Sequence, residues 1–90
     1  MRVADRIRSK LTAALQPSHL EIVDESHRHK GHVGARPNGE THFRVEVVAE
    51  TFRGKNRLAR QRLVYAVLRE EMSSDIHALS LVTRAPNEVP

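Results

Sequence analysis

The sequence has no cysteine and no long apolar run. Without cysteine the chain cannot form a disulfide, a thiolate metal site or a cysteine nucleophile. A membrane-spanning helix needs about 20 consecutive apolar residues, and no stretch here approaches that length. We therefore expect no membrane partner. We expect a protein of a reducing compartment, the cytoplasm.

Aromatic side chains are few: Phe43, Phe52 and Tyr65. A protein that binds single-stranded nucleic acid by stacking bases on aromatic rings would be poorly equipped. The net charge of +4 comes from 15 Lys and Arg against 11 Asp and Glu. This moderate excess of mixed sign permits nucleic-acid binding and is equally typical of a solvated surface.

Residues 1–15 are basic and amphipathic, which is also typical of a mitochondrial transit peptide. Asp5 argues against that alternative. Apolar residues recur every four positions from Val3 to Leu15 and predict one face of a first helix. Pro17 ends this helix.

The rest of the chain alternates between strand and helix patterns. Short alternating segments predict strands at residues 19–26, from about His42 onward, and at residues 76–83. Residues 28–40 contain Gly31, Gly34, Gly39 and Pro37, which predicts a long loop. Residues 55–72 predict a long helix that is apolar on two sides. Leu58, Val64, Tyr65, Leu68 and Met72 form its main stripe.

The element order is therefore α-β-β-α-β, an α/β (α+β) fold. The first two strands should be antiparallel. Strands two and three should be parallel, with a right-handed crossover through the helix. Both helices should cover one face of a three-stranded mixed sheet. We expect one domain at residues 1–85 and a short tail at residues 86–90.

This topology gathers histidines at one end of the sheet. Strands two and three begin there, and the long loop leads into strand two. Five of the six histidines are expected at that end: His27, His29, His32, His42 and His77. Imidazole is a common metal ligand, but the loop spacing matches no standard zinc pattern. The alternative interpretation of the loop is a solvated turn. The alternative for His42 is a side chain that hydrogen-bonds to the loop backbone.

No catalytic constellation is present. The sequence contains neither a G-x-S-x-G nucleophile elbow nor a G-x-x-x-x-G-K phosphate loop. Glu25 and Glu40 flank the loop and are able in principle to do acid–base chemistry with a histidine. A chain of this size offers little pocket volume. We expect no enzymatic activity.

A second candidate surface is basic. Lys55, Arg57, Arg60 and Arg62 lie at and just inside the start of the long helix, where backbone N–H groups favour phosphate. The alternative is a solvated basic face.

Five short segments occur in order along the chain: Val23-Asp-Glu-Ser-His, Gly39-Glu-Thr-His-Phe-Arg-Val, Phe52-x-Gly-Lys, Arg60-Gln-Arg-Leu-Val-Tyr and Ile76-His-Ala-Leu-Ser-Leu. With these segments the chain resembles the BolA family over nearly its whole length. The resemblance implies a fold like the type II KH domain, in agreement with the derived order.

The resemblance also implies a partner and a cofactor. BolA-like proteins pair with monothiol glutaredoxins, and a [2Fe-2S] cluster bridges the two. The glutaredoxin supplies a cysteine and a glutathione thiolate, and the BolA-like protein supplies histidine. His77 matches the family's histidine in strand three. The second ligand would come from the loop, where His29 is favoured and His32 is the alternative.

Some BolA-like proteins are described as transcriptional regulators, which implies DNA as an alternative partner. KH domains that bind nucleic acid use a G-x-x-G clamp. Here that turn reads Gly54-Lys-Asn-Arg57 and lacks the second glycine. A DNA-binding role would therefore rest on the basic helix. Alone, we expect the chain to be a monomer or a weak dimer, without a cluster.

Overall fold

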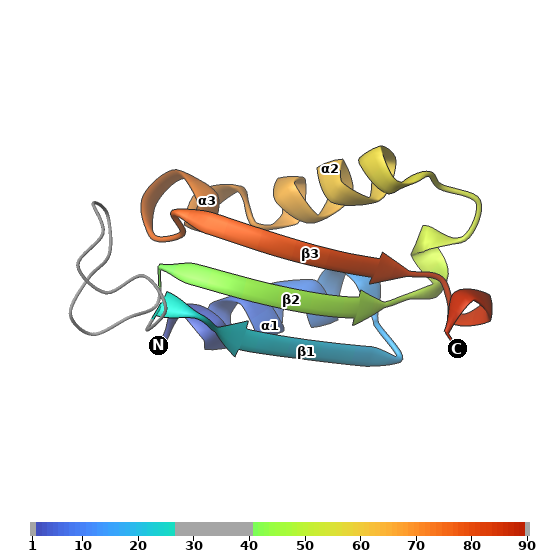
Figure 1. Cartoon of the computed structure of the whole chain (residues 1–90), viewed down its shortest axis with the longest axis horizontal. Helices are drawn as coiled ribbons and strands as arrows, with labels where there is room; N and C mark the ends of the chain where they lie inside the picture. Colours follow the sequence, from blue (N-terminus) through green and yellow to red (C-terminus); the bar gives the residue numbers. More distant parts are fainter. Residues whose placement is uncertain (1, 27–40, 90) are drawn as a thin grey trace.

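The three described strands form one mixed sheet, in which they lie side by side in chain order. The computed structural model describes residues 2–26 and 41–89. The strands are β1 (His19–Asp24), β2 (His42–Val48) and β3 (Ala78–Arg84). β1 pairs with β2 antiparallel, and β2 pairs with β3 parallel (Figure 1). Both predicted pairings are confirmed.

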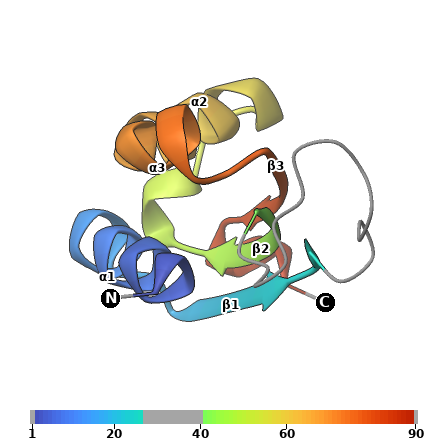
Figure 2. The same ribbon diagram turned by 90° about the vertical axis from the view of Figure 1, so that its left-hand side faces the viewer.

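The three α-helices that the structure describes cover the same face of this sheet (Figure 2). They are α1 (Val3–Leu15), α2 (Arg57–Val67) and α3 (Arg69–Ser74). The prediction of a single helix over residues 55–72 is wrong, because two helices occupy this part of the chain. The backbone leaves helical geometry at Leu68, with φ −98° and ψ 21°. Two 3₁₀ turns, η2 (Glu50–Phe52) and η3 (Pro86–Glu88), complete the described elements. No described helix is long and apolar enough to cross a membrane.

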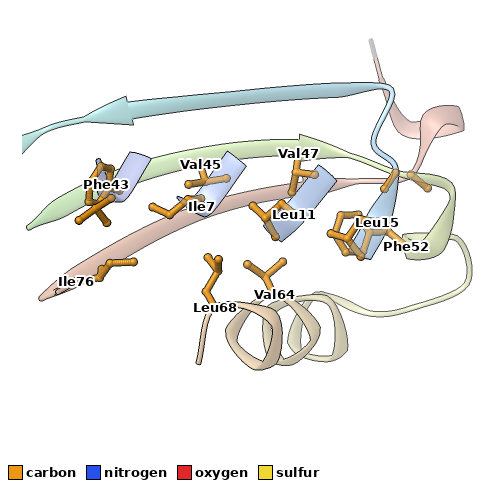
Figure 3. Close-up of a cluster of buried hydrophobic side chains, with 13 residues drawn as sticks. Ile7, Leu11, Leu15, Phe43, Val45, Val47, Phe52, Val64, Leu68 and Ile76 are labelled. Carbon is orange, nitrogen blue, oxygen red and sulfur yellow. The ribbon is translucent and has the colours of Figure 1, made fainter. Parts of the chain in front are cut away.

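The core lies between the sheet and the helices (Figure 3). The predicted stripe of α1 is confirmed, because Val3, Ile7, Leu11 and Leu15 are all buried. β2 contributes Phe43, Val45 and Val47 from its helix-facing side. The alternation of β2 follows from the two-residue period of a strand, which sends successive side chains to opposite faces.

The buried face of α2 differs from the predicted stripe. Val64 and Leu68 are fully buried, but Leu58 is 53% exposed and Tyr65 is 39% exposed. The other deeply buried positions on α2 and α3 are charged, Arg60 and Glu71. The apolar pattern missed them because it assigns charged residues to the surface, whereas a buried charge is tolerated when it is paired.

Glu71 pairs with two cations of α1. Its carboxylate accepts hydrogen bonds from Arg6 Nη2 at 3.0 Å and from Lys10 Nζ at 3.0 Å. Burial by itself would raise the pKa of Glu71, but the hydrogen bonds from Lys10 and Arg6 hold it below its usual value. Arg6 also pairs with Asp75 at 3.0 Å. This network ties α3 to α1.

Arg60 pairs with Glu88 in η3. The two Nη atoms donate to the Glu88 carboxylate at 2.6 and 2.8 Å, and Nε donates to the Phe52 carbonyl at 3.1 Å. The hydrogen bond from Arg60 lowers the pKa of Glu88 to about 2. Residues 86–88, which we expected in a tail, thus pack against α2.

Candidate functional site

The starts of β2 and β3 bring two histidine rings together. His42 begins β2, and His77 immediately precedes β3, which begins at Ala78 and not at residue 76 as predicted. The two rings stack with centroids 6.2 Å apart and planes inclined by 21°. His77 is exposed and His42 is half-buried. The predicted meeting of these two residues, 35 positions apart in sequence, is confirmed.

Thr41, a fully buried residue, holds both histidines. Its carbonyl accepts from the backbone N–H of His77 at 2.8 Å, and its Oγ1 lies 2.8 Å from His42 Nδ1. The parallel register, which places His42 beside Ala78, explains this proximity. The register of the sheet therefore places the two histidines side by side.

Ser26 contacts Thr41 and His42, which follow it after the segment 27–40. Its Oγ accepts from the backbone N–H groups of Thr41 at 2.9 Å and His42 at 3.1 Å. Its own N–H donates to Asp24 Oδ1 at 2.9 Å. Sequence reasoning missed Ser26 and Thr41. The available signal was the Asp24-x-Ser26 pattern, which is typical of a local side-chain to backbone turn.

The other predicted loop histidines, His27, His29 and His32, lie outside the described residues. His19 starts β1 opposite Val48 and so lies at the other end of the sheet, as expected. Its Nε2 is 3.9 Å from a carboxylate oxygen of Glu46.

The donor set fits a shared metal site in kind. Imidazole nitrogen ligates iron in Rieske-type [2Fe-2S] centres. Among residues 2–26 and 41–89 no group of three or more metal-ligating side chains occurs. At the starts of β2 and β3 the structure places the exposed imidazole of His77 beside that of His42. Two imidazoles are able to ligate a metal when other donors complete its coordination.

The predicted basic residues divide into two kinds. Arg60 is buried against Glu88 and is withdrawn from any phosphate-binding surface. Lys55, Arg57 and Arg62 are exposed and form no ion pair with the part of the chain that the structure describes. By contrast, the neighbouring Arg53 pairs with Glu50 at 2.6 Å. The sequence of α2 contains no acidic residue to neutralise its cations.

Comparison with known proteins gives a consistent family. Residues 11–88 match the family model described as BolA-like protein. The chain is 47% identical over 89 residues to "Protein BOLA1, chloroplastic" of Arabidopsis thaliana, covering 97% of this chain and 56% of that protein. It is 46% identical over 83 residues to "DNA-binding transcriptional regulator BolA" of Escherichia coli K12, covering 92% and 75%.

A longer Arabidopsis protein, "SufE-like protein 1, chloroplastic/mitochondrial", is 44% identical over 88 residues. These cover 93% of this chain but only 24% of that protein. The chain thus spans about half the length of the chloroplastic BOLA1 protein and about a quarter of the length of the SufE-like protein.

Solved structures agree with the fold. The structure titled BolA1 from Arabidopsis thaliana superposes with a TM-score of 0.85 at 44% identity, over 97% of this chain and 95% of that one. The BolA domain of SufE1 from the same plant gives a TM-score of 0.86 at 44% identity, over 96% and 94%. With the same element order, the same sheet and a family match over most of its length, this chain belongs to the BolA-like protein family.

Proposed function

We propose that this chain is a non-enzymatic accessory protein that binds a monothiol glutaredoxin and shares a bridging [2Fe-2S] cluster with it. His77 supplies one ligand. The observation that carries the proposal is the exposed His77 imidazole at the sheet edge, with its backbone fixed by Thr41.

Composition makes the partner necessary. A [2Fe-2S] cluster is usually held by four cysteine thiolates, and this chain has none. The glutaredoxin cysteine and a glutathione thiolate supply sulfur, and this chain supplies neutral imidazole. When bound, such a cluster carries one electron, and histidine ligation of one iron raises its reduction potential.

The second ligand from this chain comes from the segment 27–40, with His29 favoured and His32 as the alternative. Ser26 and Thr41, which flank this segment in the sequence, lie near His77, because Ser26 Oγ accepts from the backbone N–H of Thr41 and the Thr41 carbonyl accepts from the backbone N–H of His77. This proximity supports a ligand from the intervening segment.

The test mixes the purified chain with cluster-loaded monothiol glutaredoxin and records visible circular dichroism. We expect a new spectrum for the native chain, and its loss for His77→Ala. His19→Ala is the matched control, because His19 is an exposed histidine at the opposite end of the sheet. The proposal fails when the spectrum does not change on mixing, or when His77→Ala behaves like the native chain.

His29→Ala and His32→Ala, measured in the same way, assign the second ligand. The variant that loses the spectrum of the complex identifies it. Loss in neither variant would remove the loop from the ligand set.

DNA binding is the second candidate function. It is favoured by the exposed cations Lys55, Arg57 and Arg62, which form no ion pair with the described residues, and by the similarity to the Escherichia coli relative, which is named a DNA-binding transcriptional regulator. Phosphate contacts release counterions, so the logarithm of affinity falls with the logarithm of salt by about 0.9 per contact. We expect Arg57→Gln and Arg62→Gln each to reduce that slope by about one contact. Binding to duplex DNA that ignores salt and both substitutions would reject this function.

A further inference from the structure

Thr41 connects the two stacked histidines through separate atoms. Its carbonyl accepts from His77 N at 2.8 Å and from Ala78 N at 3.3 Å, which fixes the backbone before β3. Its Oγ1 contacts His42 Nδ1 at 2.8 Å, which fixes the ring orientation of His42. Its own N–H donates to the buried Ser26 Oγ at 2.9 Å. One buried residue therefore fixes the main chain of one histidine and the side chain of the other.

The side chain of His77 has a different kind of support. It is exposed and lies just outside the strand, so packing against the described residues restricts its rotation little. The support that the structure shows is the face of the His42 ring, at 6.2 Å between centroids and 21° between planes. This separation lies within the range of about 4.5–7 Å over which aromatic rings attract one another.

We propose that His42 and Thr41 are positioning residues for His77. The Thr41 hydroxyl holds the His42 ring, and the His42 ring provides a face against which the His77 imidazole rests in the orientation needed for ligation. This inference rests on the proposed function, because the positioning serves ligation by His77. A side chain that is ordered before binding loses less conformational entropy when it binds. Residues that orient a metal-ligating histidine typically change metal affinity about 10- to 100-fold when they are replaced.

Two pairs of variants separate positioning from ligation. His42→Phe keeps an aromatic face but has no nitrogen ligand, whereas His42→Ala removes both. Thr41→Ser keeps the hydroxyl, whereas Thr41→Val removes it with little change of shape. Backbone amide spectra of each variant establish that the fold is kept. Because His42 is half-buried, His42→Ala and His42→Phe are the primary pair, and the buried Thr41 variants are the second pair.

The first measurement uses the chain alone, without cluster. The ring protons of His77 are followed by nuclear magnetic resonance, since a stacked neighbouring ring shifts their resonances. We expect them to move toward the values of an unstructured histidine peptide in His42→Ala and Thr41→Val. They should keep a ring-shifted value in His42→Phe and stay near the native value in Thr41→Ser. Unchanged His77 resonances in His42→Ala would overturn the proposal.

The second measurement uses cluster-loaded monothiol glutaredoxin and visible circular dichroism. We expect affinity for the chain to fall about 10- to 100-fold in His42→Ala and Thr41→Val, and to be retained in His42→Phe and Thr41→Ser. If His42→Phe loses the complex as completely as His42→Ala, His42 acts as a ligand and the positioning role is wrong. If the native chain itself forms no complex, the proposed function fails, and the first measurement still decides whether His42 orients His77.

Discussion

Arg60 and Arg62 lie two residues apart on α2 and face opposite sides of the helix. Arg60 is buried and donates to Glu88 and to the carbonyl of Phe52. Arg62 is exposed and forms no ion pair with the described residues. The same contrast holds on α3, where Glu71 is fully buried and the neighbouring Glu70 is exposed. Buried charges that hold the fold through their partners thus lie beside exposed charges along one helical layer; exposed Glu70 lies 3.8 Å from Lys10 Nζ.

Among the charged residues of this layer, replacing Glu71 should lower the stability of the fold most. Glu71→Gln removes the fully buried carboxylate that pairs with Arg6 and Lys10, and among the described residues it leaves Arg6 only Asp75 and Lys10 only Glu70 as ion-pair partners. We expect the free energy of unfolding to fall by about 3 kcal/mol, measured by urea denaturation. Glu70→Gln is the control and should stay within about 0.5 kcal/mol of the native chain. Equal losses in the two variants would contradict the contrast.

Replacing Arg60 should cause the second-largest loss of stability. Arg60→Met keeps the aliphatic part of the side chain but removes the guanidinium that binds Glu88, the Phe52 carbonyl and the Thr83 carbonyl. We expect a loss of about 2 kcal/mol, because hydrogen bonds to charged groups each contribute more than neutral ones. Arg62→Met is the matched control, with no measurable loss expected. A stable Arg60→Met protein would show that η3 is held by other contacts.

Acid should weaken the Arg60–Glu88 pair. The pKa of Glu88 is lowered from 4.5 to about 2 by its hydrogen bond with Arg60. A carboxylate whose pKa is depressed on folding stabilises the native state above its unfolded pKa, and this contribution is lost as the pH falls toward the folded pKa. We therefore expect the melting temperature to decrease between about pH 5 and pH 2. The decrease should be smaller in Glu88→Gln.

Comparing Glu88→Gln with the native chain at several pH values tests this assignment. The difference in melting temperature between the two proteins should be present at neutral pH and shrink in acid. A constant difference would show that Glu88 contributes through packing and not through its charge.

The exposed cations should show the smallest effect on stability. Arg57 and Arg62 lack ion-pair partners among the described residues. Arg57→Gln and Arg62→Gln should therefore leave the free energy of unfolding within about 0.5 kcal/mol, by urea denaturation. A clear loss would place these side chains in the fold and weaken the case for a recognition surface.

Local patterns predicted most of the fold. The four-residue spacing from Val3 to Leu15 located α1 and its buried face. The alternation around Phe43 and Val47 located β2 and its core side. Chain connectivity then gave the strand pairing, because a helix between two neighbouring strands requires a parallel crossover. That same topology predicted the meeting of His42 and His77.

The prediction went wrong where a residue's environment depends on a distant partner. Leu58 and Tyr65 were expected inside, but Arg60 and Glu71 occupy buried positions instead. Arg60 meets Glu88, 28 positions later, and Glu71 meets Arg6, 65 positions earlier. No periodicity of a single helix contains that information. The break at Leu68 was missed for a related reason, because leucine is a good helix former and carries no local stop signal.

The sequence by itself determined which metal ligands this chain is able to offer. It has no cysteine thiolate, but it has six histidine imidazoles and 11 carboxylate side chains. Only the tertiary structure decided the arrangement at the edge of the sheet. The parallel register of β2 and β3 puts His77 against Thr41, and Ser26 Oγ accepts from the backbone N–H of the same residue. These contacts join residues 15 to 36 positions apart, which local patterns cannot specify because they depend on which strands pair.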